Sequence, residues 1–455
     1  MRHAARRISA LLSVSAVIMT MLGGCAPVED MLSPPRLTDE QMAIYKALTD
    51  SKGGGFKLKY PRTGEHRSAF VLYGGDESSA IVFYEISGIN VERSLRMNFL
   101  YKNQDGVWES LHEMPVGNGT DIESVTFASF GEDEEASILL GYAVGQHEKR
   151  LMVINNADNR PVRQLDDVFS FMQVDYFFGN EYRELLVIKN DRSMQSSMVT
   201  LYGYSDGRLQ AKVRCGLDPS AGEYTGVTQG YVMSGIPALF INHRKSDSED
   251  RYGTDILYYR GSRLINPMIE NIDNPGRVLR RTGIVTELAN PRDINGDGII
   301  EIPSVTGEFP GYSALPAAEI LRPVIWRSFN GVSFTDEYYS YYTERSDYVF
   351  FLPARWHNNV TAAVNIEENT VSFYRAGSSI EVIVEEDEPL LTVKTIFGDE
   401  ADFDSRQWAL FKEGAGSGLK YYINRDVPDD PLALTEEELL FAFRILSEIQ
   451  TPEDE

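Results

Sequence analysis

The stretch Phe70-Val71-Leu72-Tyr73-Gly74-Gly75-Asp76-Glu77-Ser78-Ser79-Ala80-Ile81-Val82-Phe83-Tyr84 decides the fold prediction. It holds two apolar runs, rich in aromatic and β-branched side chains, on either side of a polar Gly/Asp turn. That pattern is typical of two strands joined by a loop. A further apolar run at 97–101 ends in the turn Gln104-Asp105-Gly106. The sequence therefore predicts strands paired through short turns in this region.

The same order of strands and turns recurs four more times before residue 336. The second strand of each unit begins near Ile81, Ile138, Leu185, Ala238 and Ile302, at spacings of 57, 47, 53 and 64 residues. Spacings of this size suit a four-stranded propeller blade with its loops. We therefore predict a mainly β protein with a β-propeller at 66–336, built of about five blades, or of six or seven if flanking strands complete others. A tandem of β-sandwiches is the alternative.

The pattern changes at about residue 340, which predicts a small α+β domain at 340–455. Apolar runs predict strands at 360–364, 371–374, 380–384 and 390–396. A Thr cap at Thr435 with Glu three positions later predicts a helix start. An apolar stripe extends that predicted helix to the end of the domain: Leu439, Leu440, Phe443, Leu446 and Ile449.

The first 24 residues have the pattern of an export signal. Arg2, Arg6 and Arg7 precede an apolar run at 8–22, which is short for a membrane span of about 20 apolar residues. Leu22-Gly23-Gly24-Cys25 resembles the lipobox of bacterial lipoproteins. That resemblance implies that Cys25 receives a lipid and becomes the first residue after cleavage. An ordinary signal peptide with a chance cysteine is the alternative.

Residues 25–37 follow as a short, proline-containing tether, and 38–65 are predicted to form a helix and a lead-in to the β region. Thr38-Asp39-Glu40-Gln41 is a capping box, with Thr at the cap and Gln at the third helical position. Ile44, Ala47 and Leu48 then recur at helical spacing.

Charge and cysteine content limit the classes of function. Without the arginines of the export signal, 40 basic residues face 68 acidic ones, a net charge of −28 with histidine neutral. So acidic a chain argues against nucleic acid as a partner and suits cations or basic partners. Because Cys25 is used by lipid, Cys215 is left without a disulfide partner.

The segment Asp293-Ile294-Asn295-Gly296-Asp297-Gly298-Ile299-Ile300-Glu301 has the pattern of a cation-binding loop. Ca²⁺ takes roughly six to eight oxygen ligands, and oxygen side chains stand here at positions one, three, five and nine. We predict one structural Ca²⁺, held by the side chains of Asp293, Asn295, Asp297 and Glu301 and by the Ile299 carbonyl. A metal-free Asx-type turn is the alternative.

This nine-residue form, followed by Ile302-Pro303, resembles the calcium loops of FG-GAP/VCBS propeller blades, as in integrin α-subunits. The resemblance covers the 66–336 region, but the loops at 74–79, 131–134 and 179–181 keep Gly and acids without the alternating ligands. It therefore implies calcium at one blade. The whole layout, from lipobox and Pro34-Pro35-Arg36-Leu37 to the C-terminal domain, is similar to a group of uncharacterised lipoproteins of Clostridia-type bacteria, which implies no activity.

No complete catalytic set stands out in the sequence. Gly203-Tyr204-Ser205-Asp206-Gly207 matches G-x-S-x-G, but a nucleophile elbow needs a helix after the serine, and a strand pattern follows here. Asp206-Gly207 is a hairpin signal, so we interpret Ser205 as a turn residue. Cys215 is interpreted as a buried apolar residue.

We therefore expect a non-enzymatic binding or scaffold lipoprotein, anchored to the cell membrane on its outer side. It would present its propeller loops to a protein or glycan of the cell envelope. The alternative is an envelope carbohydrate-active enzyme, a lyase or hydrolase, with acids converging in the propeller pocket. A third hypothesis is an assembly or folding factor for exported chains.

Overall fold

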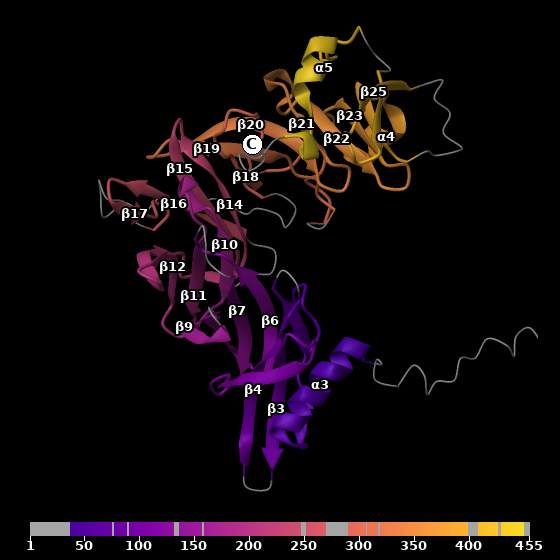
Figure 1. The fold of residues 1–455 in the computed structure, drawn as a ribbon. Coiled ribbons are helices and arrows are strands. Elements are labelled where there is room, and N and C mark those ends of the chain that lie inside the picture. Colours follow the sequence, from indigo (N-terminus) through magenta and orange to yellow (C-terminus); the bar gives the residue numbers. More distant parts are fainter. Residues whose placement is uncertain are drawn as a thin grey trace, which may run out of the picture. The chain divides into compact units, whose positions relative to one another are not determined.

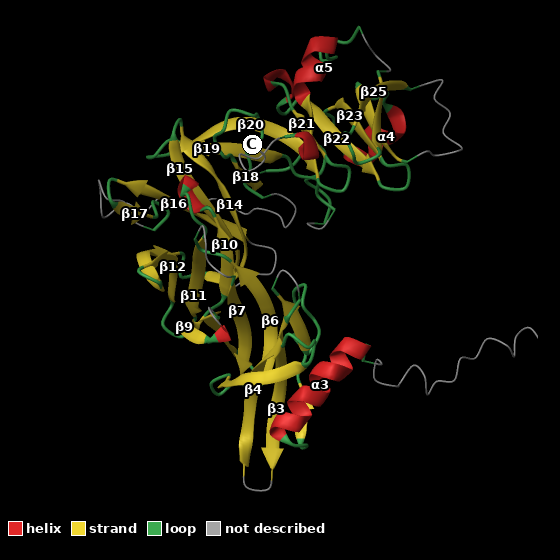
Figure 2. Cartoon of the chain, in the orientation of Figure 1, coloured by secondary structure: helices red, strands yellow, loops and turns green. Residues whose placement is uncertain are grey.

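A computed structural model gives the fold (Figures 1 and 2). It describes residues 37–74, 77–88, 91–131, 136–156, 159–246, 252–269, 290–305, 307–316, 319–398, 408–425 and 429–449. Among these residues the strands form six separate sheets with a few short helices, which confirms the mainly β class. The export signal and Cys25 lie outside the described residues. No helix of the described part is long and apolar enough to cross a bilayer.

The described chain divides into two compact units, and the first contains α3 (Asp39–Lys52), one sheet and parts of two further strands, at 121–126 and 140–144. The predicted capping box is confirmed: Thr38 Oγ1 accepts a hydrogen bond from the Gln41 N–H, and Gln41 Oε1 accepts one from the Thr38 N–H. Ile44 and Leu48 are fully buried in a cluster with residues of this sheet. Sheet 1 contains β1 (Phe56–Leu58), β2 (Phe70–Tyr73), β3 (Ser79–Gly88), β4 (Val91–Lys102) and β5 (Trp108–Pro115).

Three four-stranded sheets follow, and each is made of strands consecutive in the chain. Sheet 2 contains β6 (Asp121–Ala128), β7 (Ser137–Val144), β8 (Glu148–Asn155) and β9 (Val162–Val168). Sheet 3 contains β10 (Phe171–Asp175), β11 (Glu184–Asp191), β12 (Ser196–Ser205) and β13 (Arg208–Leu217), with the short helix η2 (Phe177–Gly179). Sheet 4 contains β14 (Ala221–Met233), β15 (Ile236–Lys245), β16 (Tyr252–Arg260) and β17 (Arg263–Ile265).

The second strand of sheet 3 is buried on both faces. In β11, Leu185 and Val187 belong to a cluster with residues of sheet 2, whereas Leu186 and Ile188 belong to a cluster with residues of sheet 4. Because side chains alternate between the two faces of a strand, these four consecutive apolar residues pack against two neighbouring sheets, two residues on each. Each of these side chains is at most 1% exposed, and burial of one stabilises the fold by about 1.5–3 kcal/mol.

Strand β15 repeats this arrangement one sheet further along the chain. Leu239 and Ile241 pack with sheet 3, whereas Ala238 and Phe240 pack in a cluster with Ile302. Sheets 2 to 5 therefore follow one another as successive packed layers, which explains why the inner strands are continuous apolar runs.

Sheet 5 differs from the prediction in two respects. Its order is β18 (Ile302–Val305), β19 (Val324–Phe329), β20 (Phe334–Thr343), β21 (Tyr348–Phe351) and β27 (Phe443–Ile445). Ile302 therefore begins the first strand of its sheet, where the repeat placed it in a second strand. The boundary expected at 336–340 falls inside β20, and one hydrophobic cluster joins Tyr341 and Phe350 of this sheet to Phe373 and Tyr421 of the next.

The C-terminal segment forms sheet 6 and four short helical elements. The sheet contains β22 (Val360–Asn365), β23 (Thr370–Arg375), β24 (Leu391–Phe397), β26 (Leu419–Asn424) and β25 (Ala409–Glu413). The helical elements are η3 (Ala354–Trp356), α4 (Ile380–Glu386) and α5 (Glu436–Ala442), with η5 (Leu446–Glu448) after β27.

Two local predictions in this segment are wrong. Residues 380–384, predicted as a strand, lie in α4, where Ile380 and Ile383 bury one face at helical spacing. The C-terminal helix ends at Ala442 rather than continuing to Ile449. Phe443 leaves the helix because it stacks on Tyr348, with ring centroids 4.8 Å apart and planes at 21°, and pairs with β21 as a strand.

Candidate functional site

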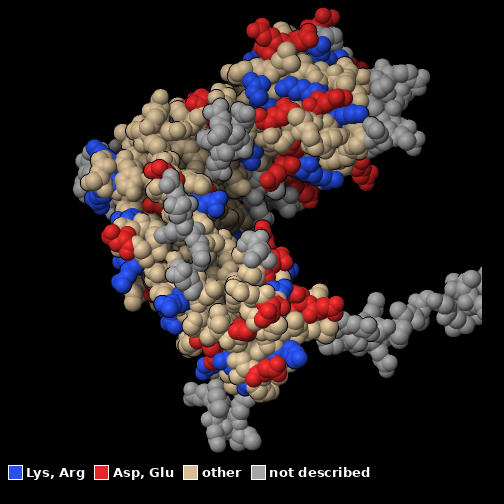
Figure 3. All heavy atoms as spheres, in the orientation of Figure 1, with Lys and Arg blue, Asp and Glu red and all other residues tan. Residues whose placement is uncertain are grey.

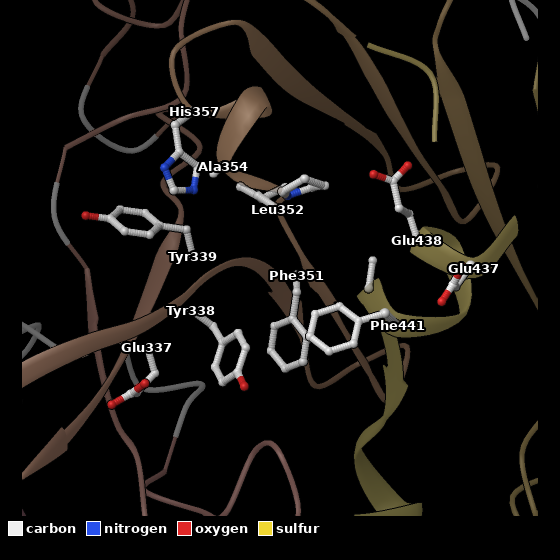
Figure 4. A pocket seen from close by; sticks show the side chains of 12 residues that line it. Glu337, Tyr338, Tyr339, Phe351, Leu352, Ala354, His357, Glu437, Glu438 and Phe441 are labelled. Atoms are coloured by element: carbon white, nitrogen blue, oxygen red, sulfur yellow. The ribbon is translucent and has the colours of Figure 1, made fainter. Parts of the chain in front are cut away.

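A pocket of about 500 Å³ opens beside sheet 5, where β20, the end of β21, η3 and α5 meet (Figure 4). All of these elements belong to the second compact unit. The pocket is lined by Glu337, Tyr338, Tyr339, Phe351, Leu352, Pro353, Ala354, His357, Glu437, Glu438, Phe441 and Ala442. The pairing of β27 with β21 brings α5 to this place, because β27 follows the helix directly in the chain.

Five rings form much of the pocket wall. Tyr338 and Phe351 are stacked, with centroids 4.4 Å apart and planes at 24°, and the Phe441 ring lies 6.3 Å from Phe351. Tyr339 packs against His357 at 4.3 Å. Phe441 is 56% exposed, so its ring is open to a partner.

Three carboxylates accompany these rings. Glu437 and Glu438 stand in the first turn of α5, and Glu337 stands on β20, where its Oε1 accepts a hydrogen bond from Ser328 Oγ at 2.5 Å. Acidic side chains gather over α5 in the face shown in Figure 3. The pocket therefore combines ring faces with negative charge.

One side of the pocket is fixed by Arg355. Its guanidinium donates to both Glu438 oxygens, with 2.7 Å between Nη2 and Oε2, and also to the Ala433 carbonyl. The hydrogen bonds from Arg355 and from the Thr435 N–H lower the pKa of Glu438 to about 2. Glu438 is therefore a fixed anion at physiological pH, and the bidentate pair joins η3 to α5.

The predicted cation loop at 293–301 has the backbone hydrogen bonds of successive Asx turns. Asp293 Oδ1 accepts from Gly296 N at 2.7 Å, and Asp293 Oδ2 accepts from Gly298 N at 2.6 Å. Asn295 Oδ1 accepts from Asp297 N at 2.9 Å, and Asp297 Oδ1 accepts from Ile299 N at 2.8 Å. Gly296 and Gly298 both have positive φ, near 85°, which explains glycine at these positions.

Glu301 is the last residue of the loop, and its buried side chain is hydrogen-bonded to the backbone at the start of the loop. It is 1% exposed, and its Oε2 accepts a hydrogen bond from Ile294 N at 3.0 Å. Burial, followed by the charges of Asp297, Asp293 and Glu337, raises the pKa of Glu301 to about 8. The carboxyl group therefore lies in a site where its ionised form is disfavoured unless positive charge is supplied.

The loop fits a cation in the type and spacing of its oxygens. The Asn295 amide Nδ2 lies 3.0 Å from Asp297 Oδ2 and 3.5 Å from Glu301 Oε1, so the donor group of the amide bridges the two carboxylates. In the described part of the chain, no three Asp, Glu, His or Cys side chains converge closely enough to hold a metal as they stand. Calcium binding would require the Asn295 amide to turn its oxygen inward.

Sheet 4 contains a buried ionic network that the sequence analysis did not identify. Lys245 Nζ lies 2.5 Å from Asp218 Oδ2 and 3.2 Å from His243 Nε2. His243 lies between two buried carboxylates, with Nε2 3.6 Å from Asp218 and Nδ1 3.7 Å from Asp255. Although burial raises the pKa of Asp218, its hydrogen bonds with His243 and Lys245 lower that pKa overall. These side chains are almost closed to solvent, so removal of one partner would leave a buried charge uncompensated.

The two remaining sequence candidates have structural roles. Ser205 ends β12, and Asp206 and Gly207, both with positive φ, form the hairpin turn to β13. Cys215 is buried, 7% exposed, in the cluster between sheets 3 and 4. The interpretations of both residues are confirmed.

Sequence patterns gave part of the pocket. Tyr338-Tyr339-Ser340-Tyr341-Tyr342 is an aromatic run in the sequence, but no local pattern places Phe441 beside it. Tyr341 and Ser340 are buried, whereas Tyr338 and Tyr339 are partly exposed. His357 and Phe441 stand about 80 residues apart, and no local pattern joins them.

Comparisons with known proteins do not assign a family. No family description matches the sequence, and no curated protein matches it. Among solved structures, a candidate 6-phosphogluconolactonase from Bacteroides uniformis is 10% identical, with a TM-score of 0.27, over 72% of this chain and 90% of that one. The β-propeller domain of the Trilobed protease from Pyrococcus furiosus is 9% identical, with a TM-score of 0.24, over 75% of this chain and 91% of that one. TM-scores this low do not establish a shared fold.

Proposed function

We propose that this protein is a lipid-anchored, non-enzymatic binding protein of the bacterial cell envelope, held outside the cytoplasm by acyl chains on Cys25. The export pattern of the first 24 residues and the Leu22-Gly23-Gly24-Cys25 motif support the anchor. Each acyl CH₂ that enters the bilayer contributes about 0.8 kcal/mol, so several chains on one cysteine anchor stably. The tether at 25–37 then connects the folded part to the membrane.

The ring-lined pocket beside sheet 5 is the observation that carries the binding role. Affinity is greatest where the walls are fixed before the partner arrives. Here Arg355 joins η3 to α5, and the Trp356 indole donates to the Leu432 carbonyl at 2.8 Å, so the elements that line the pocket are fastened together. We propose that a protein or glycan of the envelope inserts a group into this pocket.

We infer that sheets 1 to 5 are blades of a β-propeller of the FG-GAP/VCBS type. The support is the sequential four-stranded layout of sheets 2 to 4 together with strands that bury both faces, such as β11. In a β-sandwich each sheet buries one face and exposes the other, whereas a blade packs on two neighbours. This argument favours blades over the sandwich alternative.

We also propose one structural Ca²⁺ in the 293–301 loop. Its ligands would be the side chains of Asp293, Asn295, Asp297 and Glu301 and the carbonyl of Ile299. The buried carboxyl of Glu301 supports this proposal, because a nearby cation offsets the cost of ionising it. The ion would pin the loop that leads into β18.

The alternative of an envelope lyase or hydrolase requires a carboxyl group that can donate a proton near neutral pH. Glu438 lines the pocket, but its low pKa makes it a poor proton donor. The pocket nevertheless combines carboxylates with rings, the combination that a sugar-cleaving site uses. Release of reducing ends from envelope glycans by the purified protein, abolished by Glu437→Gln, would favour this alternative over binding.

Fractionation of cells that express the full chain or its Cys25→Ala variant tests the anchor. We expect the full chain in the membrane fraction, and the variant released or retained only with its signal uncleaved. Purified residues 26–455 are then added to envelope fragments treated with protease or with a glycan hydrolase. Loss of binding after one treatment identifies the partner as protein or glycan. Binding to neither untreated nor treated envelope would contradict the proposed function.

A further inference from the structure

We propose that the pocket beside sheet 5 binds an organic cation, namely an alkylammonium or quaternary ammonium group. This inference rests on the proposed binding role and names the chemistry of the group that enters. It is carried by the charges around the pocket and by the arrangement of its rings.

The charges that line the pocket have one sign. Three of the twelve lining residues are glutamates, and none is a lysine or arginine. Arg355 offsets Glu438, but in the part of the chain that the structure describes no Lys or Arg pairs with Glu337 or Glu437. Two carboxylates are therefore left to attract a cation, and the acidic chain as a whole does the same.

The rings provide the second half of such a site. A cation is attracted to the negative face of an aromatic ring within about 6 Å of its centre. In Figure 4 the rings of Phe351 and Phe441 meet near the centre of the view, between Tyr338 and the glutamates of α5. Phe441 is 56% exposed, and the Arg444 guanidinium carbon lies over its ring, 5.4 Å from the centroid. This ring therefore already attracts a cation within the chain, and the partly exposed Tyr339 offers a second ring.

A neutral sugar would also pack on these rings, but it would leave the carboxylates without positive charge. An anionic ligand would meet the like charges of Glu337 and Glu437. Ring faces and glutamates, with no Lys or Arg among the lining residues, therefore favour an ammonium group. That group has two sources: a small quaternary ammonium compound, or the side chain of a lysine in a partner protein.

Calorimetry and saturation-transfer NMR on residues 26–455 test this inference with paired probes. Choline is compared with 3,3-dimethylbutan-1-ol, which has the same shape with carbon in place of the charged nitrogen. Nα-acetyl-lysine methylamide is compared with its uncharged norleucine analogue. We expect one ammonium probe to bind about 2- to 30-fold more tightly than its neutral partner, which is the range of a cation–π contact. Preference for choline or for the lysine amide identifies the source.

Two variants with matched controls locate the binding. Phe441→Ala removes an exposed ring of the pocket, and Phe397→Ala removes a 45% exposed ring at the end of β24. Glu437→Gln removes a carboxylate of the pocket, and Glu436→Gln removes its neighbour in the helix, which does not line the pocket. We expect Phe441→Ala and Glu437→Gln to weaken the ammonium probe several-fold and the controls to leave it unchanged.

Equal binding of a charged probe and its neutral partner, or no binding of either ammonium probe, would overturn the inference. Equal loss in the control variants would overturn it as well. These results differ from a failure of the proposed function. If envelope fragments still bind and the binding depends on Phe441, the pocket is the binding site but takes a neutral group.

Discussion

Replacement of Glu301 by glutamine is predicted to stabilise the metal-free protein at neutral pH. Burial and the neighbouring acids raise the pKa of this carboxyl from 4.5 to about 8 in the folded state. The folded chain therefore holds the proton more tightly than the unfolded chain does. As the pH rises from 4.5 to about 8, ionisation of Glu301 destabilises the folded state by an increasing free energy, and this cost levels off above about pH 8.

The size of this effect follows from the pKa difference. One pKa unit corresponds to about 1.4 kcal/mol, so the cost at pH 7 is about 3 kcal/mol and approaches about 5 kcal/mol above pH 8. Glutamine cannot ionise, and its oxygen can still accept the hydrogen bond from Ile294 N. Glu301→Gln should therefore gain up to about 3 kcal/mol at pH 7 and close to nothing at pH 4.

Urea unfolding in the presence of a chelator, between pH 4 and 8.5, measures this gain. Glu308→Gln, at an exposed position in the same part of the chain, is the matched control. A gain that grows with pH in Glu301→Gln, with none in the control, is the predicted result. A variant that matches the wild type at pH 8, or is less stable there, would refute the argument. Millimolar calcium should reverse the order, because the variant lacks one carboxylate ligand.

Three further substitutions test other parts of the structure by thermal and urea unfolding. Lys245→Met removes the cation nearest to buried Asp218 and should cost about 3–5 kcal/mol at pH 7; an unchanged unfolding midpoint would show that the network adds no stability. Gly230→Ala places a Cβ 2.6 Å from Cδ1 of buried Ile300, and the forced shift should cost about 1–3 kcal/mol, so a variant as stable as the wild type would contradict the packing of β14. Thr435→Ala removes the cap of α5 and should lower stability by about 1 kcal/mol, an effect that Thr435→Ser should largely restore.

The inner strands could be predicted from the sequence because a run of adjacent apolar residues is enough to indicate that a strand is buried on both faces. Leu185-Leu186-Val187-Ile188 is a continuous apolar run, and the structure buries it on both faces. The capping boxes at Thr38 and Thr435 were likewise visible, since a cap depends on residues three positions apart.

The pocket could not be predicted in full, because it depends on pairing between distant segments. Phe443 continues the helical stripe in the sequence, yet it leaves the helix to stack on Tyr348, nearly 100 residues earlier. The change from helix to strand at Phe443 ends α5 and places the Phe441 ring 6.3 Å from Phe351 of β21. In α4, β-branched residues that favour a strand form a helix instead, because Ile380 and Ile383 find a buried face at helical spacing.

The most direct test of the account is the affinity of residues 26–455 for purified cell envelope. Wild-type protein, Phe441→Ala and Phe397→Ala are compared in a sedimentation titration. The account predicts that the wild type and Phe397→Ala bind alike and that Phe441→Ala binds several-fold more weakly. Equal binding by all three proteins would contradict the claim that the pocket beside sheet 5 is the binding site.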